Sequence, residues 1–240
     1  MILTIIIPAY NEEETIEDII LKVLAVKFPN QIKMQILVIN DASTDKTMAK
    51  VKNIKIKNNI KNLKLISHSV NMGKGQAIKT GLKSAAGEII LIQDADLEYD
   101  PEYLPRLIKP ILLNKASVVY GTRLKNYPLR LTGVKRTPLI SHYIANKLLS
   151  LITSLLYGKS VTDMETGYKV FTKEVLKNIN LNSNRFDIEP EITAKVLKKG
   201  YKIFEVPIKT IPRGYNEGKK ITWKDGFVAL WTLVKYRFID

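Results

Sequence analysis

The chain has 240 residues, of which 45% are hydrophobic and 25% are charged, and it contains no cysteine. A chain of this length buries a substantial core and fits one large α/β domain. The absence of cysteine excludes disulfides and thiolate metal sites, and two histidines are too few for a histidine-rich zinc centre. A metal ion in this protein would therefore be a hard cation held by oxygen atoms.

The positive charge is concentrated in the second half of the chain. Residues 1–120 carry 16 Lys and Arg against 13 Asp and Glu, a net charge of +3, whereas residues 121–240 carry 22 against 10, a net charge of +12. A basic half indicates a phosphate-rich partner, which can be a nucleic acid, a nucleotide or an anionic membrane surface. A lysine-rich solvated surface explains the composition equally well.

The first hundred residues alternate between short apolar runs and amphipathic stretches. The spacing of apolar residues predicts three helices, the first capped by Asn11 with Glu14 as its capping-box partner and the others covering residues 45–51 and 74–86. Alternation with short connections predicts a doubly wound, mostly parallel α/β sheet that binds ligands at the carboxyl ends of its strands. The apolar runs that predict buried strands cover residues 2–7, 34–39, 63–67 and 88–92.

The second half is less regular. It contains one further predicted strand, at 117–121, and three predicted helices, at 138–157, 189–199 and 223–238. No internal repeat, low-complexity segment or linker-like stretch interrupts it. We therefore expect one domain over residues 1–240, with helices on both faces of the sheet and a C-terminal helical elaboration.

The apolar segments are too short to cross a membrane. The chain opens on an apolar run without the basic segment that begins a signal peptide. The apolar run that comes nearest to a membrane span, residues 148–158, falls short of the ~18 residues that a span needs. We expect a protein without a membrane-spanning helix.

The most informative pattern is the triplet Asp94-Ala95-Asp96, directly after the predicted strand 88–92. Two carboxylates one residue apart at the end of a strand can share a divalent cation that bridges a diphosphate. Such a pair is common in loops and is weak evidence alone. Five acidic residues lie between Asp94 and Glu102 of this basic protein, however, and they repel one another unless a cation lies among them.

Three other loops contain candidate ligand-binding residues. Tyr10, after the first strand, is suited to stacking on a nucleobase, and Asp41, after the second, to accepting its N–H groups. Helix capping by Asn11 and Asp45 explains both loops without a ligand, so the two interpretations stay open. The third loop, Gly73-Lys74-Gly75, opens a helix but lacks the dinucleotide-binding and Walker A patterns, which leaves Lys74 as a candidate phosphate contact.

Taken together, these motifs resemble the GT-A core of family 2 glycosyltransferases, and later motifs resemble the polyprenyl-phosphate (dolichyl-phosphate) mannose and glucose synthases. The resemblance covers nearly the whole chain. Two residues depart from the common pattern: Asn40 stands where many members have an Asp, and Glu98 where mannose synthases often have a Gln. The segments that carry the resemblance are Pro8-Ala9-Tyr10-Asn11-Glu12, Asn40-Asp41-Ala42-Ser43, Asn71 to Gly75, Asp94-Ala95-Asp96, Gly121-Thr122-Arg123, Asp163 to Lys169 and Gly218 to Ile221.

The resemblance implies inverting transfer of a hexose, mannose or glucose, from a GDP- or UDP-linked sugar to a polyprenyl or dolichyl phosphate with Mg²⁺ or Mn²⁺. Residues 1–122 would bind the donor and residues 123–240 the acceptor. By position, catalysis would involve Asp96, Asp163 and Arg123, metal binding Asp94, Asp96 and Glu98, and acceptor phosphate binding Arg123 and Arg136. The residues placed at the nucleotide sugar are Pro8, Tyr10, Glu12, Ile39, Asp41, Lys74, Asp94, Ala95, Arg213 and Lys219.

The charge pattern supports a phosphate acceptor independently. A phosphate monoester is largely a dianion at neutral pH and can attack an anomeric carbon without a general base, provided that cations screen its charge. Residues 123–136 contain five Lys and Arg and no acid. A sugar hydroxyl as acceptor would instead require a base, for which Asp163 is the candidate; a purely structural role in a turn is its alternative.

The expected partners are a nucleotide sugar and a polyprenyl or dolichyl phosphate. We also expect the protein to lie peripherally on the anionic, cytoplasmic face of the membrane, where a membrane protein is a further candidate partner. The predicted helices 138–157 and 223–238 suit either core packing or an interfacial position. A nucleotidyltransferase is a more remote interpretation, because the glycine-rich basic loop that such an enzyme would have near residue 10 is absent from the sequence. A nucleic-acid-binding module would explain the charge but not the acids at strand ends, so we expect no nucleic acid partner.

Overall fold

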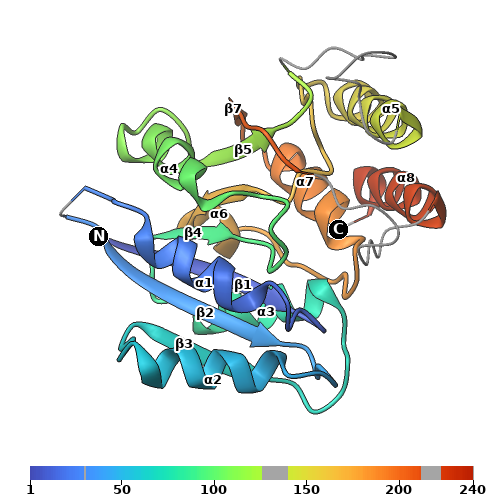
Figure 1. Ribbon diagram of the computed structural model, residues 1–240. Helices are drawn as coiled ribbons and strands as arrows, with labels where there is room; N and C mark the ends of the chain where they lie inside the picture. Colours follow the sequence, from blue (N-terminus) through green and yellow to red (C-terminus); the bar gives the residue numbers. More distant parts are fainter. Residues whose placement is uncertain (30, 126–139, 212–222, 240) are drawn as a thin grey trace, which may run out of the picture.

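The computed structural model describes residues 1–29, 31–125, 140–211 and 223–239 (Figure 1). A seven-stranded sheet has the order β3-β2-β1-β4-β6-β5-β7. All neighbouring pairs are parallel except those of β6, which runs antiparallel to both β4 and β5. The strands are β1 (Ile2–Ala9), β2 (Lys33–Asn40), β3 (Leu63–Ser67), β4 (Ile89–Ile92), β5 (Val118–Thr122), β6 (Lys169–Thr172) and β7 (Ile203–Pro207).

Alternate residues of the central strands face two different cores. Leu3, Ile5 and Ile7 of β1 pack in one cluster with the apolar sides of α1, α2 and α4, whereas Ile6 packs with Ala77 of α3 on the other side. The sheet is thus covered by helices on both faces, as expected from its continuous apolar strands. The helices are α1 (Ile16–Ala25), α2 (Thr47–Lys57), α3 (Lys74–Ser84), η1 (Pro101–Tyr103), α4 (Leu104–Leu112), α5 (Ile140–Tyr157), α6 (Lys173–Lys177), α7 (Ile188–Lys198) and α8 (Trp223–Phe238).

The C-terminal elaboration is a helical layer built on α7. Leu149 of α5, Leu197 of α7 and Leu233 of α8 belong to one buried cluster. In Figure 1, α5 (yellow) and α8 (red) lie side by side at the end of the molecule remote from α2 and β3. No helix in the described part of the chain is both long and apolar enough to cross a bilayer.

The expected capping box at Asn11 is wrong. The first helix begins at Ile16, and Asn11 has a positive φ of 52°. Its amide oxygen accepts the Thr44 N–H at 2.9 Å, and its own N–H donates to Ser43 Oγ at 3.0 Å. Asn11 therefore ties the loop after β1 to the loop after β2, which holds the two strand ends in a fixed relation.

The turn at Gly73 is shaped by a segment of the second half. Gly73 has φ +93°, and a Cβ on it would lie 2.4 Å from the carbonyl oxygen of Asn184. The Gln76 N–H donates to that same oxygen at 3.0 Å. The start of α3 is therefore covered by the 182–185 loop, and glycine is required because no side chain fits between the two backbones.

We expect Gly73→Ala to lower the free energy of unfolding by about 1–3 kcal/mol, because alanine is strained at this φ and its methyl group overlaps Asn184. Urea denaturation monitored by circular dichroism measures the change. Gly226→Ala is the matched control: it lies within α8 with no atom near its added Cβ. It should raise stability by roughly 0.5–1 kcal/mol. Equal effects of the two substitutions would contradict the role of the close contact.

Candidate functional site

Charged side chains from several strands meet at the carboxyl edge of the sheet. Asp41 follows β2, Asp94 follows β4 and Arg123 follows β5, three strands that run in the same direction. Lys169 begins the antiparallel β6 and so enters the same edge from the opposite direction. This edge is where an open α/β sheet binds its ligands.

Lys74 lies between two carboxylates from different parts of the chain. Its ammonium is 2.7 Å from Asp94 Oδ1 and 2.9 Å from Glu189 Oε1. Burial acts to lower the pKa of Lys74, but Asp94 and Glu189 outweigh it and hold the pKa well above its usual value. Lys74 is thus a permanent cation between the DxD triplet and α7, a different environment from the expected phosphate contact.

Glu189 continues this row of alternating charges into the core. Its Oε2 lies 2.5 Å from Nζ of the fully buried Lys169. Burial acts to raise the pKa of Glu189, but Lys169 and Lys74 together lower it. The Lys169 ammonium also donates to the carbonyl oxygens of Met164 and Thr166. The row Asp94–Lys74–Glu189–Lys169 therefore fixes the loop that contains Met164 relative to the DxD triplet.

That loop touches Asp94 directly. A Cβ added to Gly167 would lie 2.2 Å from Asp94 Oδ2, so only glycine permits this approach. The Gly167 N–H donates to the Tyr99 hydroxyl at 2.9 Å, and the Tyr99 ring packs edge-to-face on Tyr168. The Tyr168 hydroxyl donates in turn to Gln93, the residue before Asp94. A buried aromatic network thereby positions the carboxylate.

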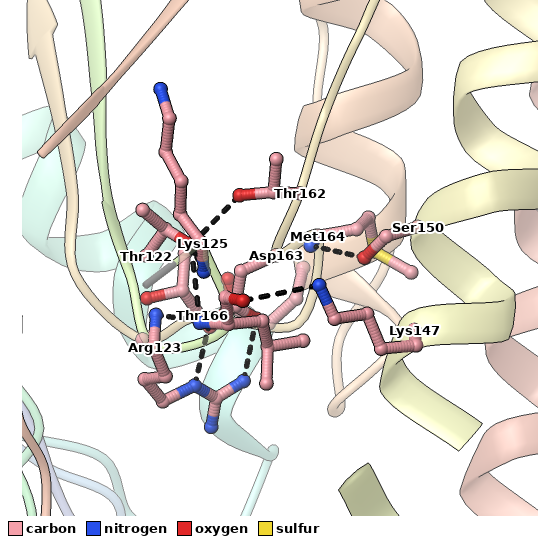
Figure 2. Close-up of polar contacts among 12 residues, drawn as sticks. Thr122, Arg123, Lys125, Lys147, Ser150, Thr162, Asp163, Met164 and Thr166 are labelled. Atoms are coloured by element: carbon pink, nitrogen blue, oxygen red, sulfur yellow. Dashed lines mark hydrogen bonds and ion pairs between the residues drawn. The ribbon is translucent and has the colours of Figure 1, made fainter. Parts of the chain in front are cut away.

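Arg123 is held in a fixed orientation by Asp163 (Figure 2). Asp163 Oδ2 accepts from the Arg123 backbone N–H and from Nε, both at 2.8 Å, and Oδ1 accepts from Nη2 at 2.7 Å. Burial acts to lower the pKa of Arg123, but Asp163 raises it. The remaining three guanidinium N–H groups have no partner among the residues that the structure describes. The Arg123 side chain is 22% exposed, so those groups can reach a ligand.

The loop that carries Asp163 is itself braced from three sides. Thr162 Oγ1 lies 2.8 Å from Thr122 Oγ1, and the Thr162 N–H donates to Glu205 of β7. Ser150 of α5 accepts the Met164 N–H, as Figure 2 shows. Because Asp163 is fully buried and committed to Arg123, the structure favours a positioning role over the general-base role considered above.

Glu165 is the least well paired acid of the site. Burial raises its pKa to about 7, although Lys169 and Arg123 act to lower it. Its buried Oε1 has no hydrogen-bond partner in the described part of the chain. A carboxyl group with this pKa carries a substantial protonated population at pH 7.

Asp41 is engaged by its own protein. Oδ1 accepts the Met72 N–H at 2.9 Å and lies 2.7 Å from His68 Nδ1, while Oδ2 accepts the Gly73 N–H at 2.7 Å. The other ring nitrogen of His68 lies 2.9 Å from Thr80 Oγ1. Three of the four acceptor positions of this carboxylate are therefore occupied, and one on Oδ2 remains.

The other residues predicted to bind the nucleoside lie in two kinds of place, a loop and the hydrophobic core. Pro8, Tyr10 and Glu12 lie at the partly buried end of β1 and in the loop after it. Ile39 is fully buried in the cluster beneath α3, and Ala95 is buried in the cluster on the other face. The side chains of these last two cannot line an open site, so a contact with a nucleoside would have to come from their backbone.

Asp94, Asp96 and Glu98 are not gathered into a three-ligand cluster. Within the described ranges no three acidic or histidine side chains come close enough to hold a metal ion together. The Glu98 N–H donates to Asp96 Oδ1 at 3.3 Å, and Asp94 Oδ1 is paired with Lys74. One or two carboxylates completed by phosphate oxygens and water are nevertheless the usual ligands of Mg²⁺ in nucleotide sites, so these residues fit such an ion.

Three expected phosphate ligands, Arg136, Arg213 and Lys219, lie outside the described residues. Several residues that complete the site, among them Glu165, Lys169 and Glu189, had no predicted role. Lys169 and Glu189 are separated by twenty positions and meet only through the antiparallel β6 and the start of α7. A charged residue inside an apolar run, as Lys169 is, could have signalled a buried ion pair. Gln93 and Tyr99 gave no such signal.

The model of glycosyl transferase family 2 matches residues 4–179. The chain belongs to this family. A UDP-N-acetylglucosamine–dolichyl-phosphate N-acetylglucosaminyltransferase from Methanococcus voltae is 32% identical, over 96% of this chain and 94% of that protein. A dolichyl-phosphate beta-glucosyltransferase from Trichomonas vaginalis is 32% identical over 86% of this chain and 64% of its own length. A dolichol-phosphate mannosyltransferase from Pyrococcus furiosus is 28% identical over 91% and 59%.

Solved structures confirm the GT-A fold class expected from the sequence. The chain is similar over its whole length to glucosyl-3-phosphoglycerate synthase from Mycobacterium tuberculosis in complex with Mn²⁺, UDP and phosphoglyceric acid, with a TM-score of 0.73 and 18% identity over 79% of that chain. At this identity the similarity establishes the fold alone. The family predicted from the motifs and the fold predicted from the alternation of strands and helices are both confirmed.

We expect Lys74→Met to lower the free energy of unfolding of this family 2 glycosyltransferase by about 3–5 kcal/mol, because Asp94 and Glu189 lose the cation between them. Thermal and urea denaturation measure the loss. Lys22→Met is the control: it removes the exposed 2.9 Å ion pair with Asp100 and should change stability by less than about 1 kcal/mol. A Lys74→Met protein as stable as the parent would show that the buried row does not support the fold.

Proposed function

We propose that this enzyme transfers a hexose from a nucleotide sugar to a polyprenyl or dolichyl phosphate, with inversion at the anomeric carbon and with Mg²⁺ or Mn²⁺. The observation that carries the proposal is the Arg123 guanidinium, which Asp163 holds at the same sheet edge as the DxD triplet and which has three N–H groups without a partner among the described residues. A planar guanidinium fork suits two oxygens of one phosphate. In this arrangement residues 1–122 bind the donor and residues 123–240 the acceptor.

The commitment of Asp163 to Arg123 supports a phosphate as the nucleophile. Asp163 accepts three hydrogen bonds from Arg123 and is fully buried, so it is poorly placed to deprotonate a sugar hydroxyl. A phosphate dianion needs no deprotonation. One of its oxygens forms a bond to the anomeric carbon while the bond from that carbon to the nucleoside diphosphate breaks. Attack from the opposite side inverts the configuration.

The DxD triplet provides for the leaving group. Asp94 and Asp96, with Glu98, are the residues that would hold Mg²⁺ or Mn²⁺ together with diphosphate oxygens. When bound, the cation stabilises the negative charge that develops on the leaving diphosphate. The pairing of Asp94 with Lys74 fixes the orientation of its carboxylate.

The limited acceptor capacity of Asp41 favours uridine over guanosine as the nucleoside. The pairing edge of uracil presents a single N–H, whereas that of guanine presents N–H donors on two adjacent nitrogens, which require two acceptors. Because Met72, Gly73 and His68 already engage both oxygens of Asp41, and because this residue is only 3% exposed, Asp41 cannot accept both donors of a guanine. The Methanococcus voltae relative, whose name specifies a UDP-linked donor, agrees with this choice.

Exposed apolar stripes on α5 and α8 support contact with a membrane, which a polyprenyl phosphate requires. Leu155 and Trp231 are 75% and 67% exposed, and basic residues flank them, as in interfacial helices. Soluble surfaces rarely leave so many apolar side chains in water on two adjacent helices. The exposed apolar residues of this pair are Ile144, Leu148, Leu151, Leu155, Phe227, Val228, Trp231 and Phe238.

A donor and acceptor panel tests the proposal. We expect UDP-glucose or UDP-N-acetylglucosamine, rather than GDP-mannose, to yield a glycosylated isoprenyl phosphate by mass spectrometry with farnesyl or undecaprenyl phosphate as acceptor. EDTA and Asp96→Ala should each lower the rate by on the order of a hundredfold or more. Arg123→Lys should raise the KM for the acceptor more than that for the donor. Product formed only on sugar hydroxyls would contradict the proposal.

Vesicle sedimentation tests the membrane contact. We expect the protein to sediment with phosphatidylglycerol vesicles, and to do so less at 1 M salt, where the Debye length falls to about 3 Å. Burial of apolar side chains should leave a salt-resistant fraction, which Leu155→Ser with Trp231→Ser removes. Ile56→Ser in α2, where the parent residue is 79% exposed, is the control and should sediment like the parent. Identical sedimentation of both variants at high salt would contradict an interfacial role for α5 and α8.

A further inference from the structure

The unsatisfied buried polar atoms of the described chain all lie in one place. They are Glu165 Oε1, Thr166 Oγ1 and Glu189 Oε1, although the last is within ion-pair distance of Lys74. All three residues are linked to Lys169: its ammonium pairs with Glu189 and donates to the Thr166 carbonyl, and its charge acts on Glu165. Buried polar atoms are rarely left without a partner, so an ionised carboxylate at this place would be costly.

The charges around Glu165 favour its protonated form. Lys169 of β6 and Arg123 after β5 are cations, and Glu189 of α7 and Asp163 of the same loop are anions. These four groups sum to zero. An ionised Glu165 would therefore add an uncompensated negative charge to a buried cluster, whereas a protonated Glu165 leaves the cluster neutral.

A proton on Glu165 would favour binding of the acceptor phosphate in the proposed reaction. Arg123 and Glu165 are close enough that the carboxyl contributes to raising the pKa of the guanidinium. A phosphate bound at the unpaired N–H groups of Arg123 would approach the same carboxyl. An ionised Glu165 would repel a phosphate dianion, whereas a protonated one offers it an O–H donor.

Resting on the proposed function, we propose that Glu165 is a protonated acid at neutral pH and that it binds the acceptor by donating its proton in a hydrogen bond to the phosphate held at Arg123. Glu165 is then an acceptor-binding residue that selects a phosphate over a neutral hydroxyl. Binding of the dianion and protonation of Glu165 favour each other. Acceptor binding should accordingly weaken as pH rises above about 7, where Glu165 ionises.

The KM for farnesyl phosphate between pH 6.5 and 9 tests this linkage. In the parent we expect it to rise about tenfold per pH unit above the point where Glu165 ionises, because only the protonated form binds. Glu165→Gln keeps a neutral donor of the same shape and should give a constant KM over this range. Glu174→Gln, at an exposed position of α6, is the control and should follow the parent. A Glu165→Gln profile that rises like that of the parent would overturn the proposal.

Two measurements decide the protonation state without any turnover. Carbon NMR of labelled glutamate side chains should show one carboxyl that titrates near pH 7 in the parent and is missing from Glu165→Gln. Because burial raises this folded-state pKa to about 7, above the ordinary value of 4.5, stability is lost as pH rises between those values. The urea midpoint of Glu165→Gln should thus exceed that of the parent at pH 8 by more than at pH 5. A carboxyl that titrates near 4.5 would overturn the proposal.

The same experiments separate this proposal from the proposed function. Calorimetry at several pH values between 7 and 8 should show that binding of farnesyl phosphate to the parent is accompanied by proton uptake. Glu165→Gln should show no such proton uptake. If the parent shows this linkage but forms no glycosylated isoprenyl phosphate, the proposed function fails and the role of Glu165 in phosphate binding stands. If farnesyl phosphate does not bind the parent, or binds without proton uptake, the role of Glu165 is overturned.

Discussion

The placement of Lys74 between Asp94 and Glu189 is the interaction on which the rest of the site depends. It joins the end of β4, the start of α3 and the start of α7, three elements that no local sequence pattern connects. Without this cation the carboxylates of Asp94 and Glu189 would face each other with no positive charge between them. The row therefore fixes the end of β4 and the start of α3 against α7 and the loop before β6 at the level of single side chains.

Buried ion pairs of this kind contribute more to geometry than to net stability. The cost of removing four charges from water offsets most of the attraction among them, and well-packed apolar side chains could stabilise the fold as well. An apolar row would not, however, hold an Asp94 carboxylate 2.7 Å from a fixed cation or permit Gly167 to pack on its other oxygen. The charges are retained where orientation of a carboxylate is needed, and the glycine is the steric consequence of that arrangement.

Features of this structure that depend on local sequence patterns could be predicted, whereas features that depend on contacts between distant segments could not. The strands buried on both faces, such as β1 and β4, are continuous apolar runs and were predicted nearly at their observed bounds. The sequence analysis missed β6, which begins with the charged Lys169, and α4, which contains two prolines, because each departs from a simple local pattern. The Asn11 cap failed for a related reason, since its side chain bonds to the loop after β2 instead of the next helix.

The site shows the same distinction. Asp94, Asp41 and Arg123 could be placed at one sheet edge because they end strands that sequence alone predicts to be parallel. Their partners could not: His68 and Glu189 reach Asp41 and Lys74 from distant segments, and nothing near them in the sequence indicates a pairing. Lys74 was accordingly expected to meet a phosphate, whereas the structure gives it two carboxylates.

α7 connects this charge row to the proposed membrane surface. Glu189 lies in its first turn, and Leu197 near its other end packs with Leu233 of α8, while Lys195 stacks on Tyr236 at 4.3 Å. A helix rises about 1.5 Å per residue, so the eight residues from Glu189 to Leu197 set a distance of roughly 12 Å along one rigid element. If α5 and α8 rest at a lipid surface, α7 fixes how far the Glu189 end of the charge row lies from the part of α8 that packs on it. A phosphate on a lipid chain would then reach the anomeric carbon at a depth determined by the fold, without any loop having to carry it there.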